Sequence, residues 1–188
     1  MARASGTAPW PVAQLTVDEY HRLAEIGVVQ PDDRLELLEG WLVPKVTNSP
    51  PHAAAVQRLT RLFTLALVGS PWEVRCQLPV TLARSEPEPD IALVAAGLPA
   101  HRHPYPAELA AVIEVAHSSI TADRRVKARI YAAEGIEPYV IVNLAEAQLE
   151  LLTDPRPGGV ASYARHAVLK DGILDLAGRS FAVPKLLG

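Results

Sequence analysis

The sequence contains a single cysteine, Cys76, and few aromatic residues, which account for 5% of the chain. One cysteine cannot form an internal disulfide, so the sequence excludes a disulfide scaffold and a zinc cluster built from thiolates. Such cysteine usage is typical of proteins in a reducing compartment. We therefore expect a cytoplasmic protein.

Long apolar runs are also missing. Residues 62–69 form the most apolar helical stretch, but Gly69 and Pro71 close it well short of the roughly 18 residues that a membrane span needs. Residues 1–11 contain no apolar run that could act as the core of a signal peptide. We expect no membrane-spanning segment and no membrane partner.

A strong excess of charge of one sign is absent as well, because 18 Lys and Arg face 21 Asp and Glu, for a net charge of −3. This balance excludes a histone-like or polybasic nucleic-acid binder. Most of the acidity lies in residues 1–40, which leaves room for a locally basic surface further along the chain. A role on nucleic acid therefore has to rest on a local basic patch.

What is present suits one folded domain. The chain has 188 residues, 49% of them hydrophobic, and a single core usually spans roughly 100–200 residues. We expect residues 1–14 to form a flexible N-terminal tail and residues 15–188 to form a single domain.

Local patterns predict a helix, a hairpin and a second helix in the first third of the chain. Thr16 and Glu19 have the spacing of a capping box, which predicts a helix from there to about Gly27. Apolar residues alternate over 35–43, which predicts a β-hairpin that turns near Gly40. The apolar spacing over 52–68 is typical of an amphipathic helix that packs on a core.

The rest of the chain predicts a mixed sheet. Strand-like patterns cover 72–82, 90–94, 109–115 and 139–143. Ser119 or Thr121 can cap a helix that runs to about Glu134 and ends at Gly135. Beyond Leu149 we expect β-hairpins, with turns at 155, 157–159 and 171–172. The fold class is α/β or α+β, a mixed sheet with helices against it.

Two carboxylates stand out in this arrangement. Asp90 opens one predicted strand and Glu114 lies near the end of the next, so antiparallel pairing would bring both to the same edge of the sheet. Glu114 interrupts the apolar run 112–115, where an unpaired charge would be costly, so a cation should compensate it. The next helix offers Lys127, which shares one face with Asp123 and Tyr131 at intervals of four residues.

These groups suit metal-assisted hydrolysis. Two carboxylates without a Cys or His pair favour Mg²⁺ or Mn²⁺ over zinc. Such a metal polarises a phosphoryl oxygen and lowers the pKa of a bound water, while a lysine can orient that water or stabilise developing charge. The pattern indicates phosphodiester hydrolysis.

The order and spacing of these residues resemble the Uma-two family of proposed endonucleases, in the PD-(D/E)xK restriction-endonuclease-like superfamily. The resemblance spans about residues 16–152. It rests on Pro89-Asp90, Glu114-Val115, the helix with Asp123, Lys127 and Tyr131, the segment Gly135 to Val142, the hairpin 35–40 and His52. No single motif is decisive.

The resemblance implies a restriction-endonuclease-like fold and a Mg²⁺-dependent DNA endonuclease. It implies that Asp90 and Glu114 bind the metal, with the Val115 carbonyl as a further ligand and Glu36 as a contributor from the hairpin. The usual superfamily lysine would stand where this chain has Ala116, and Lys127 takes its place on the following helix. Because the superfamily often cuts two strands with two subunits, a homodimer is a further expectation.

Simpler interpretations remain open for several residues. Asp90 could be a solvated residue at a strand start, and Asp123 could serve only to pair with Lys127 and favour the helix dipole. Glu36 could face solvent, and His52 could simply begin its helix. Tyr131 is expected to pack in the core with its hydroxyl tethered. Glu86, Glu88, His101, His103 and His117 are expected to be surface or bystander residues. Arg124, Arg125, Lys127 and Arg129 place four cations on one helix, which could track a phosphate backbone or form a solvated outer face.

Two other functions remain open beside the endonuclease. One is a catalytically inactive restriction-endonuclease-like module that binds nucleic acid or a protein. The other is a metal-dependent hydrolase of a smaller phosphoester, since no element that reads base sequence is visible.

Overall fold

The structure is a computed structural model of the 188-residue chain, and it describes residues 13–45 and 49–188. The tail expected over residues 1–14 therefore lies outside the described residues, except for its last two. Of these, Gln14 donates from Nε2 to the carbonyl oxygen of Glu39 at 3.0 Å, so this end is attached to the hairpin that follows.

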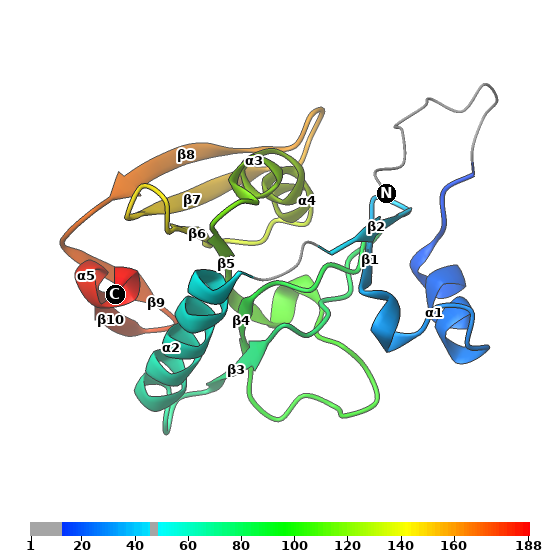
Figure 1. Ribbon diagram of the computed structural model, residues 1–188, viewed down its shortest axis with the longest axis horizontal. Coiled ribbons are helices and arrows are strands. Elements are labelled where there is room, and N and C mark those ends of the chain that lie inside the picture. The colour runs from blue at the N-terminus through cyan, green and yellow to red at the C-terminus, as the bar shows by residue number, and fades with distance from the viewer. Residues whose placement is uncertain (1–12, 46–48) are drawn as a thin grey trace.

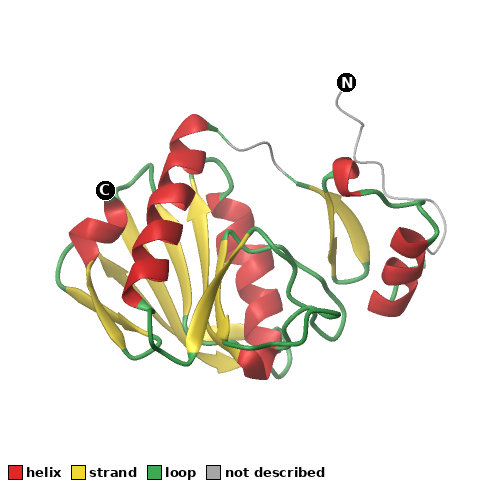
Figure 2. Cartoon of the chain, turned by 90° about the horizontal axis from the view of Figure 1, so that it is seen from below, coloured by secondary structure: helices red, strands yellow, loops and turns green. Residues whose placement is uncertain are grey.

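The N-terminal elements form as their sequence patterns predict. Helix α1 (Val17–Glu25) begins with the capping box between Thr16 and Glu19, and the 3₁₀ turn η1 (Pro31–Asp33) follows. Strands β1 (Leu35–Leu38) and β2 (Trp41–Pro44) pair as an antiparallel hairpin. In Figures 1 and 2, α1 and this hairpin lie to one side of the main sheet.

The main sheet has six strands in the order β3-β4-β5-β6-β7-β8. Neighbouring strands are antiparallel except for β5 and β6, which are parallel and joined by the helical segment between them. The strands are β3 (Trp72–Cys76), β4 (Ile91–Ala95), β5 (Leu109–Ala116), β6 (Tyr139–Asn143), β7 (Gln148–Arg156) and β8 (Ser162–Leu169). The 3₁₀ turn η2 (Pro106–Glu108) leads into β5.

Helices cover both faces of this sheet (Figure 2). Helix α2 (Pro50–Ala66) packs on one face together with the hairpin β9 (Ile173–Leu176) and β10 (Arg179–Ala182) and the C-terminal helix α5 (Val183–Leu187). The other face is covered by a continuous helical segment of α3 (Ile120–Ala122), the π-helical turn η3 (Asp123–Lys127) and α4 (Ala128–Ala133).

The central strands read as nearly unbroken apolar runs because both of their faces are buried. Along β5, Ile113 and Val115 point to the core under α2, whereas Val112 and Ala116 point to the core under α4. Since side chains alternate along a strand, Glu114 faces α4. Glu114, which interrupts this apolar run, therefore lies on the face of the sheet that α4 covers.

The fold class is confirmed, but four local predictions need correction. The strand predicted over 72–82 stops at Cys76, because residues 77–90 leave the sheet to pack against the β1–β2 hairpin. Pro155 lies inside β7, opposite Tyr163, and makes no turn. The helix after Ser119 contains the π turn η3, and α5 had no counterpart among the predicted elements.

Among the described residues, none of the helices combines the length and the apolar character needed to cross a lipid bilayer.

Candidate active site

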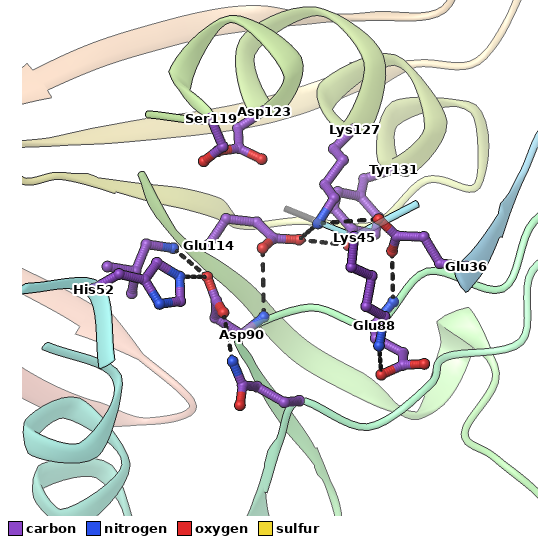
Figure 3. Close-up of polar contacts among 12 residues, drawn as sticks. Glu36, Lys45, His52, Glu88, Asp90, Glu114, Ser119, Asp123, Lys127 and Tyr131 are labelled. Carbon is purple, nitrogen blue, oxygen red and sulfur yellow. Dashed lines mark hydrogen bonds and ion pairs between the residues drawn. The ribbon is translucent and has the colours of Figure 1, made fainter. Parts of the chain in front are cut away.

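The pairing of β4 with β5 brings Asp90 and Glu114 together. Their antiparallel register places Ile91 opposite Ile113, so the residues next to them, Asp90 and Glu114, lie at the same edge of the sheet. The backbone N–H of Asp90 donates to Oε2 of Glu114 at 3.4 Å. Figure 3 shows both side chains between the helices of the two faces. The predicted convergence of the two carboxylates is confirmed.

Asp90 is held by three elements of the fold. Its Oδ2 atom lies 3.0 Å from Nε2 of His52 on α2 and accepts the N–H of Val115 at 2.8 Å. Its Oδ1 atom accepts from Nε2 of Gln77 at 3.3 Å. Burial alone would raise the pKa of Asp90, but the hydrogen bonds from His52 and Val115 outweigh it, so the pKa is lowered. Asp90 is thus kept as a buried carboxylate.

Glu114 is buried more deeply, with 3% of its surface exposed. Its Oε1 atom accepts from Nζ of Lys127 at 2.8 Å and from the hydroxyl of Tyr131 at 3.0 Å. Burial raises the pKa of Glu114 to about 8, and the Lys127 ammonium opposes that rise. The cation that a buried Glu114 required is therefore Lys127.

Lys127 also faces the hairpin. Its Nζ atom lies 4.0 Å from Oε1 of Glu36, a buried residue of β1 whose Oε2 accepts the N–H of Glu88 at 3.1 Å. Burial alone would lower the pKa of Lys127, but Glu114, Glu36 and Asp123 outweigh it and raise the pKa. Lys127 is therefore a cation shared by carboxylates from different strands.

Asp123 lies one helical turn before Lys127 and takes a separate partner. Its Oδ2 atom accepts from the hydroxyl of Ser119 at 2.6 Å, and its carbonyl oxygen accepts from the hydroxyl of Tyr139 at 3.2 Å. Burial raises the pKa of Asp123. Figure 3 shows Ser119 and Asp123 above Asp90 and Glu114, and both residues line the same cavity.

These groups line one cavity of about 650 Å³ between the hairpin, α2 and the α3–α4 segment. His117 also lines it, and its Nδ1 lies 3.3 Å from the hydroxyl of Ser49 at the start of α2. The acidic lining residues are Glu36, Glu39, Glu88, Asp90, Glu114 and Asp123, and the cationic ones are Arg34, Lys45, Lys127 and Arg129.

The donor chemistry of this cavity fits a hard divalent cation. Asp90 and Glu114 offer carboxylate oxygens, and the backbone of Val115 lies against Asp90. Within residues 13–45 and 49–188, no three His, Cys, Asp or Glu side chains group closely enough to hold a metal by themselves. Mg²⁺ usually keeps several waters and takes only one or two carboxylates, so the pair suits Mg²⁺ or Mn²⁺ and does not suit zinc.

The structure brings every candidate site residue to this cavity or its wall. The residues that line it are Asp90, Glu114, Lys127, Glu36, His52 and Asp123. Tyr131 and Val115 do not line it, but Tyr131 contacts Glu114 and Val115 contacts Asp90. From the sequence, Glu36 could have faced solvent and His52 could simply have begun its helix. In the structure, both contact the site.

Two of the expected bystander carboxylates are not exposed turn charges. Glu86 is buried, and its carboxylate lies 2.8 Å from Nε2 of His21 and also accepts from the hydroxyl of Thr81. Glu88 is half-buried and forms an ion pair with Lys45. His101 and His103 do not line the cavity.

The expected row of cations along the helix is mostly paired. Arg124 binds the buried Glu150 through Nε at 2.8 Å and Nη2 at 2.6 Å, and Arg129 lies 2.5 Å from Glu39 of the hairpin turn. Arg125 is exposed. Arg129 alone among these three arginines reaches the cavity.

Gln77 and Lys45 are contacts that the sequence did not point out. Gln77 directly follows Cys76, which pairs with Ile91, so the antiparallel register sets Gln77 opposite Asp90. Antiparallel pairing of the strand that begins at Trp72 with the strand that begins after Asp90 would have predicted this contact. Lys45 pairs with Glu88 across the hairpin and the 77–90 segment, and no local pattern signals that contact.

Comparisons with known proteins identify the family and the fold of the chain. The family model Uma2, described as "Putative restriction endonuclease", matches residues 17–180. A crystal structure of a protein described as a "putative nuclease belonging to DUF820", from Anabaena variabilis ATCC 29413, superposes with a TM-score of 0.67 at 13% sequence identity. The match covers 92% of this chain and 97% of that one, and it shows a shared fold. No curated protein matches the chain.

Proposed function

The chain belongs to the Uma2 family, and on that premise we propose that it is an endonuclease that hydrolyses DNA phosphodiester bonds with Mg²⁺ or Mn²⁺. The observation that carries the proposal is the contact among two buried carboxylate residues and a half-buried lysine. Asp90 donates its N–H to Glu114, and Glu114 accepts from Lys127 on the oxygen that also binds Tyr131.

Asp90 and Glu114 would hold the divalent ion, with the Val115 carbonyl as a further ligand. Bound there, the ion would polarise a phosphoryl oxygen and lower the pKa of a water molecule. His52 and the Val115 amide lower the pKa of Asp90, and together with Gln77 they fix its carboxylate, so this side chain needs little reorganisation when a cation arrives.

Lys127 supplies positive charge where negative charge would develop on the phosphate. Its ammonium group has three donors, and Glu114 at 2.8 Å takes one of them. The others can reach a phosphate oxygen or the attacking water, with Glu36 at 4.0 Å holding the ammonium on the cavity side. A preorganised donor of this kind typically contributes about 10²–10³ in rate.

Tyr131 and Ser119 would position the acids and not react. The Tyr131 hydroxyl fixes the rotamer of Glu114, and burial raises its own pKa well above the ordinary value, so it does not exchange a proton at neutral pH. Ser119 fixes Asp123 beside Lys127.

A plasmid-nicking assay tests the proposal. Purified wild type should convert supercoiled plasmid to the nicked form in Mg²⁺ or Mn²⁺ and not in EDTA. Asp90→Asn should abolish conversion because it removes a ligand charge, whereas Asp171→Asn, which changes an exposed carboxylate in the β8–β9 turn, should nick at the wild-type rate. Nicking by Asp90→Asn at the wild-type rate would refute the assignment.

A second function is supported by one observation. Both oxygens of Glu114 and Oδ2 of Asp90 already accept hydrogen bonds from within the chain. A set that is satisfied internally also suits a module that binds nucleic acid or a protein without cleaving it. Wild type that binds DNA but nicks no plasmid in either metal would favour this function.

A further inference from the structure

An exposed tryptophan lies in the wall of the cavity that holds the two carboxylates. Trp41 begins β2, directly after the hairpin turn, and 41% of its surface is exposed. It lines the same cavity as Asp90 and Glu114. An indole left accessible beside buried acids has little use in the fold, since the two main cores do not include it.

The hairpin and the main sheet contribute different residues to the cavity. Leu38, Val43 and Pro44 of the hairpin line it together with the indole and the charged Glu36, Glu39 and Lys45, whereas the main sheet contributes Asp90 and Glu114. A ligand that fills both parts therefore needs a flat apolar group joined to an anionic or metal-binding group. A nucleotide has this combination, with its base for the indole and its phosphate for the site.

The start of helix α2 offers few backbone donors to a phosphate. Helix α2 begins at the cavity, but Pro50 and Pro51 occupy its first two positions and have no N–H to donate. Cations lie instead on the hairpin, where Lys45 lines the cavity, and on α4, where Arg129 does. Both are paired with carboxylates at half-exposed positions, Glu88 and Glu39, which a phosphate can replace.

The depth of the acids restricts the form of the nucleic acid. Asp90 and Glu114 are 8% and 3% exposed, at the bottom of a cavity of about 650 Å³. Cavities of about 300–1,000 Å³ hold one drug-sized ligand, which is the size of a nucleotide and far smaller than a duplex. A base inside a duplex also has both faces covered by its neighbours, so it cannot stack on an indole.

We propose that Trp41 stacks on an unpaired base next to the cleaved bond, so that the substrate is single-stranded DNA or a duplex with an unpaired nucleotide at the cut. This rests on the proposed function and adds the substrate class. Stacking of a base on an aromatic side chain tolerates any base, which agrees with a cavity wall that offers an apolar surface.

Equilibrium binding of fluorescein-labelled oligonucleotides tests the inference. A 16-mer of thymidine and its duplex with the complementary strand are titrated in Ca²⁺ and in EDTA, at one fixed salt concentration. Wild type should bind the single strand about tenfold more tightly than the duplex. Trp41→Ala should lose about tenfold on the single strand and nothing on the duplex, and Trp41→Phe should keep most of the affinity.

Tyr105→Ala is the matched control, because Tyr105 is 47% exposed but does not line the cavity. It should bind both oligonucleotides as wild type does. Equal wild-type affinity for strand and duplex, or an unchanged affinity of Trp41→Ala for the single strand, would overturn the inference, and Trp41→Phe guards against a folding defect in the alanine variant.

The two proposals fail in different ways. Strand-selective binding that depends on Trp41, without cleavage in Mg²⁺ or Mn²⁺, would support the inference and contradict the endonuclease. Cleavage of duplex and single strand at equal rates, unaffected by Trp41→Ala, would leave the endonuclease in place and overturn the inference. A wild-type chain that binds neither oligonucleotide overturns the inference.

Discussion

The Nζ atom of Lys127 lies 2.8 Å from Oε1 of Glu114, although the lysine comes from the helical segment over one face of the sheet and the glutamate from strand β5. Lys127→Ala removes this donor. We expect plasmid nicking to fall about 10²–10³-fold, because charge developing on the phosphate loses its partner. The free energy of unfolding should fall by about 1–3 kcal/mol, since Glu114 loses a charged hydrogen bond.

Arg125→Ala is the control for Lys127→Ala. It removes a cation two residues away that is exposed to solvent, so its nicking rate and stability should match wild type. If both variants lost activity equally, general charge on the helix would explain the effect and the specific role of Lys127 would be wrong.

Tyr131→Phe removes one hydroxyl that binds Glu114 at 3.0 Å and leaves the ring in place. Loss of a group that orients a metal ligand typically costs about 10–100-fold in metal affinity, and isothermal titration with Mn²⁺ should measure a decrease of that size. Tyr163→Phe removes a comparable hydroxyl outside the site. This hydroxyl donates to the carbonyl oxygen of Ile136 at 2.6 Å. That variant should lose stability but bind Mn²⁺ as wild type does, and equal affinities for all three proteins would contradict the role of Tyr131.

Glu150 predicts a dependence of stability on pH. Burial alone would raise its pKa, but hydrogen bonds from Arg124 and Asn143 outweigh it and lower the pKa. A lowered pKa in the folded state means that Glu150 stabilises the fold above its ordinary pKa of about 4.5, and that this contribution disappears as the pH falls through the lower folded value.

Urea unfolding of wild type and Glu150→Gln at several pH values measures this contribution. The difference in free energy of unfolding should be about 1–3 kcal/mol at pH 7 and should shrink steadily below about pH 4.5. A difference that stays constant or grows in acid would show that the ion pair with Arg124 is not its source.

A substitution at Gly40 should cause a steric defect, because this residue combines a φ of +82° with a close neighbour. A Cβ at Gly40 would lie 2.6 Å from Cβ of Gln14 and 2.9 Å from the carbonyl oxygen of Leu15. Gly97 has a similar φ of +76° but open space around it. Gly40→Ala should therefore lower the free energy of unfolding more than Gly97→Ala does. The difference between the two losses should be at least about 1 kcal/mol. Equal losses would mean that only the backbone conformation matters at Gly40.

Much of the fold could be predicted because its local patterns agree with its packing. The capping box at Thr16 and Glu19 forms, the hairpin turns at Gly40, and the run 139–143 is a fully buried strand. The convergence of Asp90 and Glu114 followed from one inference, the antiparallel pairing of their strands. The polar interruption of an apolar run then pointed to Glu114, and its burial required the cation.

The remaining features depend on contacts between distant residues. The buried Glu86 contacts His21, which lies 65 residues away, so its turn-like local sequence gave the wrong prediction. The π turn at Asp123–Lys127 has no local pattern, since its residues have ordinary helical spacing. The link between Lys45 and Glu88 is equally non-local. Each of these contacts becomes visible only when the hairpin and the helices are placed around the sheet.

The most direct test of the account is isothermal titration of wild type and Asp90→Asn with Mg²⁺ and Mn²⁺. Asp90 and Glu114 together are proposed to hold one divalent ion, so wild type should bind one ion per chain. Asp90→Asn should bind it at least about tenfold more weakly, because a charged ligand becomes a neutral amide. Equal affinity of the two proteins for both metals would contradict the claim.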